Sequence, residues 1–374
     1  MKILDRYLLG RFGRMFAGVL AACALLFLLT EVLNNFQDIA NNDTPMRQAV
    51  LYFLCFLPYR LVQVLPLVSI LSVLFSIGIL AHNKEMLAIT ASGLSPARVA
   101  TPLIAAGVLI SIATLAIGEL VVPFTESRAQ EIRGIYIEGK SEGRQGRLLT
   151  KDIFSRGRGG TYYMMRQYDN RAHVMTHPTI IACSDDGRRL LWRMSATTGT
   201  LLAEATSQGQ TLWRFDGAVQ MTFGDKGGLK SMVRHERPLE MPLEPKLHRY
   251  LGAKRKPEEM GARELAEYIE MLTAHGESTG RYWTDFWLKI FFPFASLVFI
   301  IAGFAFAMRA QVGSIVIGFS QGILYALIFY AALALTRAMG VRSFLPPLPS
   351  AIIPLIIFAA LSIYYLRRSA YTMT

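Results

Sequence analysis

The stretch Gly134–Ser141 reads GIYIEGKS and matches the glycine, lysine and serine spacing of a phosphate-binding P-loop. A working P-loop follows a buried strand, opens a helix and wraps phosphates with a glycine-rich backbone. Here the preceding segment, Thr125–Arg133, is polar and helical in pattern, and the variable positions are bulky. We therefore reject nucleotide binding at this stretch. If ATP drives this protein, a separate subunit must hydrolyse it.

Other residue types that carry catalysis or bind metals show no working arrangement. The chain has 6 histidines and 3 cysteines, in none of the spacings that are strong signals for metal sites. His173 and His177 are four residues apart, but the following Pro178 and the strand-like context argue against one shared helix face. No Ser-His-Asp set and no paired carboxylates stand out. The sequence therefore predicts no catalytic group, no metal site and no cofactor.

Three arginines lie inside or just after long apolar segments, where a charged side chain needs a polar or charged partner. Arg60 is inside an apolar segment beside Pro58, and Arg128 and Arg133 follow another apolar segment. Ionisable groups in such places usually face protein, water or a polar ligand, and guanidinium groups bind phosphate through paired hydrogen bonds. The three arginines are therefore candidates for holding a phosphorylated headgroup, and ordinary interfacial anchoring is the alternative.

A short amphipathic helix is predicted at about residues 82–95. Met86, Leu87 and Ile89 form its apolar side next to Glu85, and a glycine and a proline end it. A short helix that projects from a membrane protein can dock in a groove of a partner. The alternative is a plain interfacial linker.

The segments that must position these residues are long apolar blocks. The chain of 374 residues is 52% hydrophobic with a mean hydropathy of +0.34, which is too apolar for a soluble protein of this size. A bilayer is crossed by about 20 apolar residues. The blocks that reach this length are Met15–Leu33, Ala49–Ala81, Val99–Val122, Phe286–Met308, Gly313–Thr336 and Ser350–Leu366. We therefore predict six transmembrane helices, with residues 1–123 holding the first three and residues 284–374 the last three.

Basic residues in the termini and short loops predict the orientation. The side that holds the N-terminus carries Lys2, Arg6, Arg11, Arg14, Lys84, Arg98, Arg309, Arg367 and Arg368, whereas the opposite short loops carry only Arg47, Arg337 and Arg342. This bias predicts cytoplasmic termini in a bacterial inner membrane and a periplasmic location for the polar segment. The net charge of +12 then has a topological origin, and we expect no nucleic-acid partner.

The polar segment has the pattern of antiparallel β structure. Short β-prone runs at 161–165, 190–194, 211–215 and 218–223 alternate with turn signals such as Asp185-Asp186-Gly187 and Asp216-Gly217. We predict a sandwich or jelly roll over residues 124–256, which could bind protein, sugar or lipid or serve only for docking. An amphipathic helix is expected within residues 257–283, leading into the fourth transmembrane helix.

With these residues in view, the chain resembles the LptF/LptG (YjgP/YjgQ) permeases of lipopolysaccharide export, and the LptG branch more closely. The resemblance covers nearly the whole chain. The motifs that carry it are Leu4-Asp5-Arg6-Tyr7, Glu85 with Ala91-Ser92-Gly93, Ala116-Ile117-Gly118-Glu119, Gly280-Arg281-Tyr282, Trp287-Leu288-Lys289-Ile290-Phe291, Pro346-Pro347 and Pro354. Each motif is weak alone, and their order and membrane context together are specific.

The resemblance implies a permease subunit of an ABC transporter that extracts lipopolysaccharide and has no catalytic residues of its own. It implies a heterodimer with an LptF-like permease, a dimer of the ATPase LptB, and the bridge proteins LptC and, through it, LptA. Glu85 would be the acidic residue of a coupling helix, together with Met86, Leu87 and Ile89, and Arg133 would lie at the cavity mouth.

The chain departs from the family at the outer end of the first helix, where basic residues are common. This chain has Glu31, Asn34, Asn35, Gln37 and Asp38 there. Either Arg60, Arg128 and Arg133 supply the contacts to phosphate instead, or the lipid A that this chain handles carries a different headgroup charge. A rival interpretation is a membrane-anchored scaffold or sensor whose β domain binds a periplasmic protein, which predicts no dependence on an ATPase.

Overall fold

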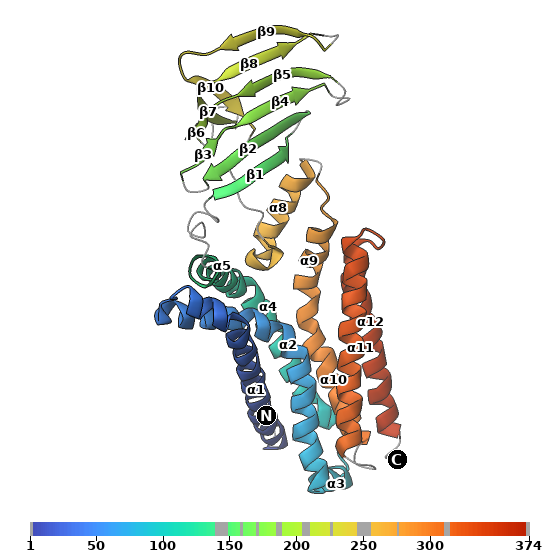
Figure 1. Cartoon of the computed structure of the whole chain (residues 1–374). Helices are drawn as coiled ribbons and strands as arrows, with labels where there is room; N and C mark the ends of the chain where they lie inside the picture. The colour runs from blue at the N-terminus through green and yellow to red at the C-terminus, as the bar shows by residue number, and fades with distance from the viewer. Residues whose placement is uncertain are drawn as a thin grey trace.

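The computed structural model describes residues 3–138, 149–157, 160–169, 172–184, 189–203, 210–224, 227–244, 256–274, 277–309 and 315–371. A bundle of long helices carries a β-sheet at one end (Figure 1). The two chain ends and the short helix α3 (Glu85–Ala91) lie at the opposite end of the bundle.

Six helical spans in the described residues are long and apolar enough to cross a membrane, which confirms the predicted number. They are formed by α1 (Ile3–Asn41), α2 (Met46–His82), α4 (Pro96–Leu120), α9 (Gly280–Phe291) continued through η3 (Phe292–Phe294) into α10 (Ala295–Arg309), α11 (Ile315–Val341) and α12 (Pro347–Tyr371). Most extend beyond the apolar blocks because polar end residues also join the helix. α2 runs through Pro58 and Pro66 without a break, since neighbouring helices re-satisfy freed backbone groups in a membrane bundle.

The centre of the bundle is the contact between α2 and α10. Ile70, Val73 and Leu74 of α2 are fully or almost fully buried there. A Cβ atom on Gly303 of α10 would lie 3.0 Å from Ile70 Cγ1, and one on Gly322 of α11 would lie 2.4 Å from Leu74 Cδ1. Small residues at these crossings let the helices approach closely, which is how membrane helices gain packing energy.

A helical segment joins the third membrane helix to the sheet. It consists of α5 (Val122–Ile132) and the π-helical turn η1 (Arg133–Ile137), and it lies beside the sheet-proximal ends of α1 and α2 (Figure 1). Its buried side chains share a cluster with α2 that contains Tyr52, Cys55, Phe56, Ala129, Ile132 and Ile137. The P-loop-like stretch begins in η1, and its residues 139–141 lie outside the described residues.

Within the part of the chain that the structure describes, the sheet has ten antiparallel strands, as expected for an antiparallel β domain. The strands are β1 (Leu149–Arg156), β2 (Thr161–Asp169), β3 (Val174–Thr176), β4 (Thr179–Cys183), β5 (Leu190–Ser195), β6 (Thr198–Ala203), β7 (Thr211–Asp216), β8 (Val219–Phe223), β9 (Leu229–Arg234) and β10 (Leu239–Leu243). The predicted turn at 185–187 lies outside the described residues.

The long strand β2 divides the sheet into two branches. Residues Thr161–Met164 pair with β4, which leads to β5, β8 and β9. Residues Gln167–Asp169 pair with β3, which leads to β6, β7 and β10, and β1 also pairs with β2. One apolar cluster joins both branches through side chains such as Met194 of β5 and Trp213 of β7, both essentially buried. A jelly roll in the strict sense stays a prediction.

The chain returns to the bundle through α8 (Ala262–Ala274), which follows the short turn η2 (Pro257–Glu259). α8 occupies the segment where an amphipathic helix was expected. Its Leu265 and Ile269 are completely buried and pack with Met260 and with aromatic residues of α9. Figure 1 shows α8 between the sheet and the membrane helices.

Candidate functional site

The predicted coupling segment forms α3, at the end of the bundle away from the sheet (Figure 1). Glu85 is its first residue, and its side chain is 36% exposed. The carboxylate accepts hydrogen bonds from Tyr7 Oη at 2.7 Å and Asn83 Nδ2 at 3.1 Å, and Arg11 lies 3.5 Å away. The hydrogen bonds from Tyr7 and Asn83 lower the pKa of Glu85, so the side chain is held in its charged form.

The apolar residues of α3 connect it to the bundle. Met86 is fully buried in the main helical core, and Ile89 packs against the same core while remaining partly exposed. The side chain of Leu87 lies outside what the structure describes. Glu85 is therefore accessible from outside, whereas Met86 ties α3 to the membrane helices.

The three arginines border the junction of α2 with α5 and η1, each with contacts of its own. Arg60 lies over the rings of Phe56 and Tyr59, at 4.9 Å and 5.5 Å from the ring centres. This cation–π arrangement is how interfacial arginines are commonly anchored. The structure therefore gives Arg60 a role in packing at the membrane-helix surface, and its headgroup contact stays a prediction.

Arg128 and Arg133 are each paired with a carboxylate of their own helical segment. Arg128 lies 2.6 Å from Glu131, and Arg133 lies 3.0 Å from Glu138. Both arginine side chains are more than two-fifths exposed. A phosphate group that binds either arginine must therefore compete with a carboxylate that is already in place.

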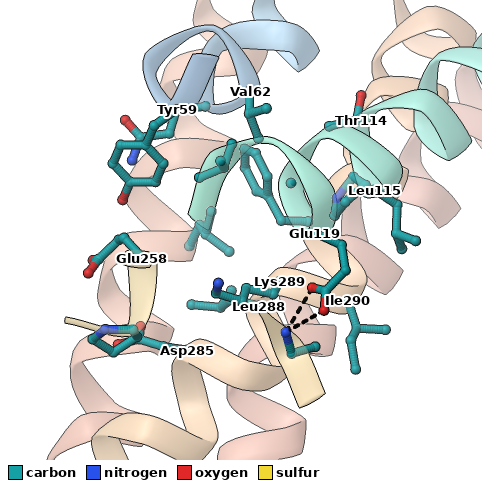
Figure 2. A pocket seen from close by; sticks show the side chains of 18 of the residues that line it. Tyr59, Val62, Thr114, Leu115, Glu119, Glu258, Asp285, Leu288, Lys289 and Ile290 are labelled. Atoms are coloured by element: carbon teal, nitrogen blue, oxygen red, sulfur yellow. Dashed lines mark hydrogen bonds between the residues drawn. The ribbon is translucent and has the colours of Figure 1, made fainter. Parts of the chain in front are cut away.

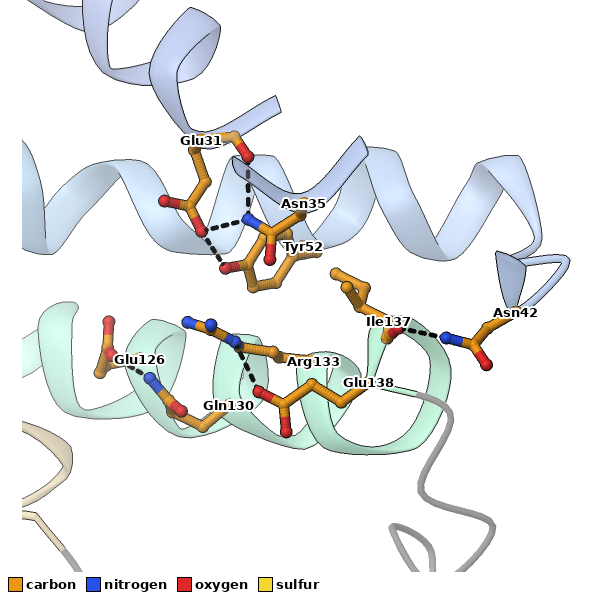
Figure 3. A network of polar contacts seen from close by, with 9 residues as sticks. All are labelled: Glu31, Asn35, Asn42, Tyr52, Glu126, Gln130, Arg133, Ile137 and Glu138. Atoms are coloured by element: carbon orange, nitrogen blue, oxygen red, sulfur yellow. Dashed lines mark hydrogen bonds and ion pairs between the residues drawn. The ribbon is translucent and has the colours of Figure 1, made fainter. Parts of the chain in front are cut away.

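The polar residues at the end of α1 face this same junction (Figure 3). Glu31 accepts a 2.5 Å hydrogen bond from Tyr52 Oη and a 2.8 Å hydrogen bond from Asn35 Nδ2. On the α5 side, the buried Glu126 accepts from Gln130 at 2.8 Å. The acidic end of α1 is thus part of an ordered network.

The charges shown in Figure 3 sum to an acidic site. Arg133 is accompanied by the carboxylates of Glu31, Glu126 and Glu138. Glu138 is near Arg133 in the sequence. Glu31 comes from a different helix, so the sequence does not reveal that Glu31 faces this site. These carboxylates outnumber Arg133, so an anionic ligand is opposed by the local field here and can pair with Arg133 only if it displaces Glu138.

A second group of charges was not recognised from the sequence as a site, although Glu119 and Lys289 lie in motifs of the family resemblance. Asp285 and Lys289 of α9 face a cavity together with Glu119, Glu258 and Arg337 (Figure 2). The available signal was the position of Lys289 inside, and of Asp285 immediately before, the predicted membrane segment Phe286–Met308, where ionisable groups are costly and usually functional. Their partners come from distant parts of the chain.

Taken together, six apolar spans, a large antiparallel sheet at one end of the bundle and a short amphipathic helix at the other define a multi-pass membrane protein. The family described as lipopolysaccharide export system permease LptF/LptG matches residues 6–368, so the chain belongs to this family. The chain is 22% identical to the lipopolysaccharide export system permease protein LptG of Escherichia coli strain K12, over 98% of this chain and 99% of that protein. It is also 22% identical to LptG of Haemophilus influenzae, over 98% of each chain.

Proposed function

We propose that this protein is the permease subunit of an ABC transporter that extracts lipopolysaccharide from the inner membrane and passes it to a periplasmic bridge. The observation that carries the proposal is the family match over residues 6–368 of a chain that combines six apolar spans with a ten-stranded sheet. Its partners would be an LptF-like permease, an LptB ATPase dimer, LptC and, through LptC, LptA.

The architecture suits a substrate with several acyl chains. Moving such chains into water costs about 0.8 kcal/mol for each CH₂ group, so an exporter needs a continuous apolar route. α1 offers an apolar face on the outside of the bundle, where Leu25, Leu26 and Leu33 are 67%, 61% and 67% exposed. This face fits a cavity shared with a second permease. The jelly-roll-like sheet would receive the acyl chains above it.

The proposal also includes an orientation of the protein in the inner membrane. Both chain ends and α3 lie at one end of the bundle, and the sheet lies at the other (Figure 1). The bias of basic residues predicts that the first end faces the cytoplasm, where α3 would be within reach of LptB, and that the sheet faces the periplasm. Reporter fusions that place the strands in the cytosol would refute the whole proposal.

In this proposal α3 transmits the ATPase cycle to the membrane helices. Glu85 would contact LptB, while buried Met86 would carry movement of α3 into the bundle. Replacing Glu85 with Arg reverses the charge at the contact and also opposes Arg11. We expect the amount of LptB that copurifies to fall about tenfold or more, as for a lost charge-assisted contact of about 1.5 kcal/mol or more.

The control for this experiment is Glu267→Arg, the same charge reversal at a position of α8 whose native side chain is 60% exposed. It should leave copurification of LptB unchanged. If Glu85→Arg retains LptB and supports export at the native rate, the coupling role is wrong.

For the binding of the lipopolysaccharide headgroup, we propose that one of its phosphates displaces Glu138 from Arg133. Arg133→Glu should then reduce photocrosslinking of lipopolysaccharide to a probe in η1, and Glu138→Gln should increase it, because the competing charge is gone. The matched control is Arg214→Glu on the sheet surface, where Arg214 pairs with Glu240 at 3.2 Å. Equal crosslinking in Arg133→Glu and the native chain would remove Arg133 from the site.

A further inference from the structure

A cavity of about 820 Å³ lies between α2, α4, α9 and α11, and residues of η2 and the start of α8 also line it (Figure 2). Most of its wall is apolar and includes Val62, Leu115, Leu288 and Ile290. The cavity is separate from α3, and of the three arginines proposed for the headgroup none lines it.

Two carboxylate oxygens in this cavity lack a donor among the described residues. Asp285 is only 6% exposed, and its Oδ1 accepts from Arg337, with Nη2 at 2.7 Å. The other oxygen, Oδ2, is buried and has no hydrogen-bond partner in the described chain. The same holds for Oε2 of Glu258, whose other oxygen lies 3.9 Å from Arg337. A buried acceptor without a donor is costly, so a bound donor would stabilise this site.

The remaining charges of the wall do not satisfy these two oxygens. Both oxygens of Glu119 accept from the backbone N–H of Ala262, at 2.7 Å and 2.8 Å. Lys289 donates to the carbonyl of Met260. Arg263, also on the wall, is 93% exposed and lies 3.6 Å from Glu267.

Three carboxylates and, besides the exposed Arg263, two basic side chains thus meet on this wall. The acids are Asp285, Glu258 and Glu119, and the cations are Arg337 and Lys289. The two unpartnered carboxylate oxygens call for a ligand that carries N–H donors and a positive charge. The apolar part of the wall belongs to membrane-spanning helices and suits a hydrocarbon chain. A lipid with an amine headgroup has both the N–H donors and the hydrocarbon chain.

We infer that this cavity binds a bilayer lipid whose headgroup ends in a primary ammonium group, with the ammonium donating to Asp285 Oδ2 and Glu258 Oε2 and an acyl chain along the apolar wall. Such a lipid would be a resident component that braces η2 and α8 against α4 and α9. A trimethylammonium headgroup carries the same charge but has no N–H donor, so the site should discriminate against it.

The test compares phosphatidylethanolamine with phosphatidylcholine of identical acyl chains. The full-length protein is reconstituted in an equimolar mixture of the two, extracted in mild detergent, delipidated stepwise and analysed by native mass spectrometry. We expect phosphatidylethanolamine to be retained at least tenfold over phosphatidylcholine. The double variant Asp285→Asn, Glu258→Gln keeps the side-chain sizes and should remove that preference. Equal retention of the two lipids by the native protein would overturn the inference.

A second variant tests the location independently of the charges. Gly118 lines the cavity, and a Cβ atom placed on it meets nothing within 4 Å. Gly118→Phe should therefore fold, fill the cavity and abolish retention of the ethanolamine lipid. Gly18→Phe on α1 is the control, because a Cβ on Gly18 also meets nothing within 4 Å. If Gly118→Phe keeps the lipid as well as Gly18→Phe does, the cavity is not the site.

Discussion

A hydrogen bond between the side chain of Glu119 and the backbone of Ala262 links α4 to the start of α8. The carboxylate of Glu119 receives the N–H of Ala262 on both oxygens, 143 residues further along the chain. Gly261 fits beside it because a Cβ there would lie 2.8 Å from Glu119 Oε1. A charge-assisted hydrogen bond contributes about 1.5–3 kcal/mol, and a carboxylate at a helix N-terminus adds about 0.3–1 kcal/mol. Glu119 is partly exposed, so we take the lower part of this range, about 2 kcal/mol.

Glu119→Ala removes this contact and should open the first turn of α8. A loss of about 2 kcal/mol corresponds to a factor of about 30 in the local opening equilibrium. Hydrogen exchange measures that equilibrium directly, so the amide of Ala262 should exchange about 30-fold faster, while amides of the central strand β2 stay unchanged. Glu119→Gln retains a neutral acceptor and should show a smaller increase.

The control in α8 itself is Glu267→Ala, which removes only the exposed pair with Arg263 and should change the exchange of Ala262 by less than about threefold. If Glu119→Ala and Glu267→Ala behave alike, the carboxylate of Glu119 does not hold α8, and the reasoning is wrong.

Two further predictions concern the sheet and α3. A Cβ on Gly199 would lie 2.7 Å from Cε1 of the fully buried Phe215. Gly199→Ala should therefore destabilise the sheet by about 1–3 kcal/mol, measured by thermal unfolding. Gly224→Ala is the control, because the nearest atom to a Cβ there is 3.9 Å away and no clash is expected. Because the pKa of Glu85 is lowered from 4.5, its contribution to the attachment of α3 is present above that value and is lost as the pH falls below it. The protection factors of the α3 amides, which are corrected for the intrinsic pH dependence of exchange, should therefore be constant from pH 8 to about pH 6 and fall below about pH 4. A fall in protection between pH 8 and pH 6 would contradict this.

Much of the architecture could be predicted from the sequence because it depends on neighbouring residues. A membrane helix satisfies its own backbone hydrogen bonds, so an apolar run of sufficient length predicts a span. The same holds for the short β-prone runs, of which 211–215 lies in β7 and 190–194 lies in β5. The helix at α3 is also local, since its pattern of apolar and charged residues lies within a few turns.

Contacts between distant residues could not be predicted in this way. The sequence marks Met86 as apolar, but only the packed bundle shows that it is buried while Glu85 stays accessible. The division of the sheet into two branches at β2 depends on which strands pair across long connections. Strand pairing of that kind is set by packing of the whole domain, because many registers are compatible with one local pattern.

The sequence by itself determined the membrane spans, the strand-forming runs and the positions of the charged residues. Only the tertiary structure decided what those charges face. It places Glu31 of α1 in the network around Arg133 (Figure 3), and it gathers Glu119, Glu258 and Asp285 around one cavity (Figure 2). The physical reason is that helix and strand formation depend on short-range preferences, whereas charge pairing acts through space between segments that the chain separates by a hundred residues or more.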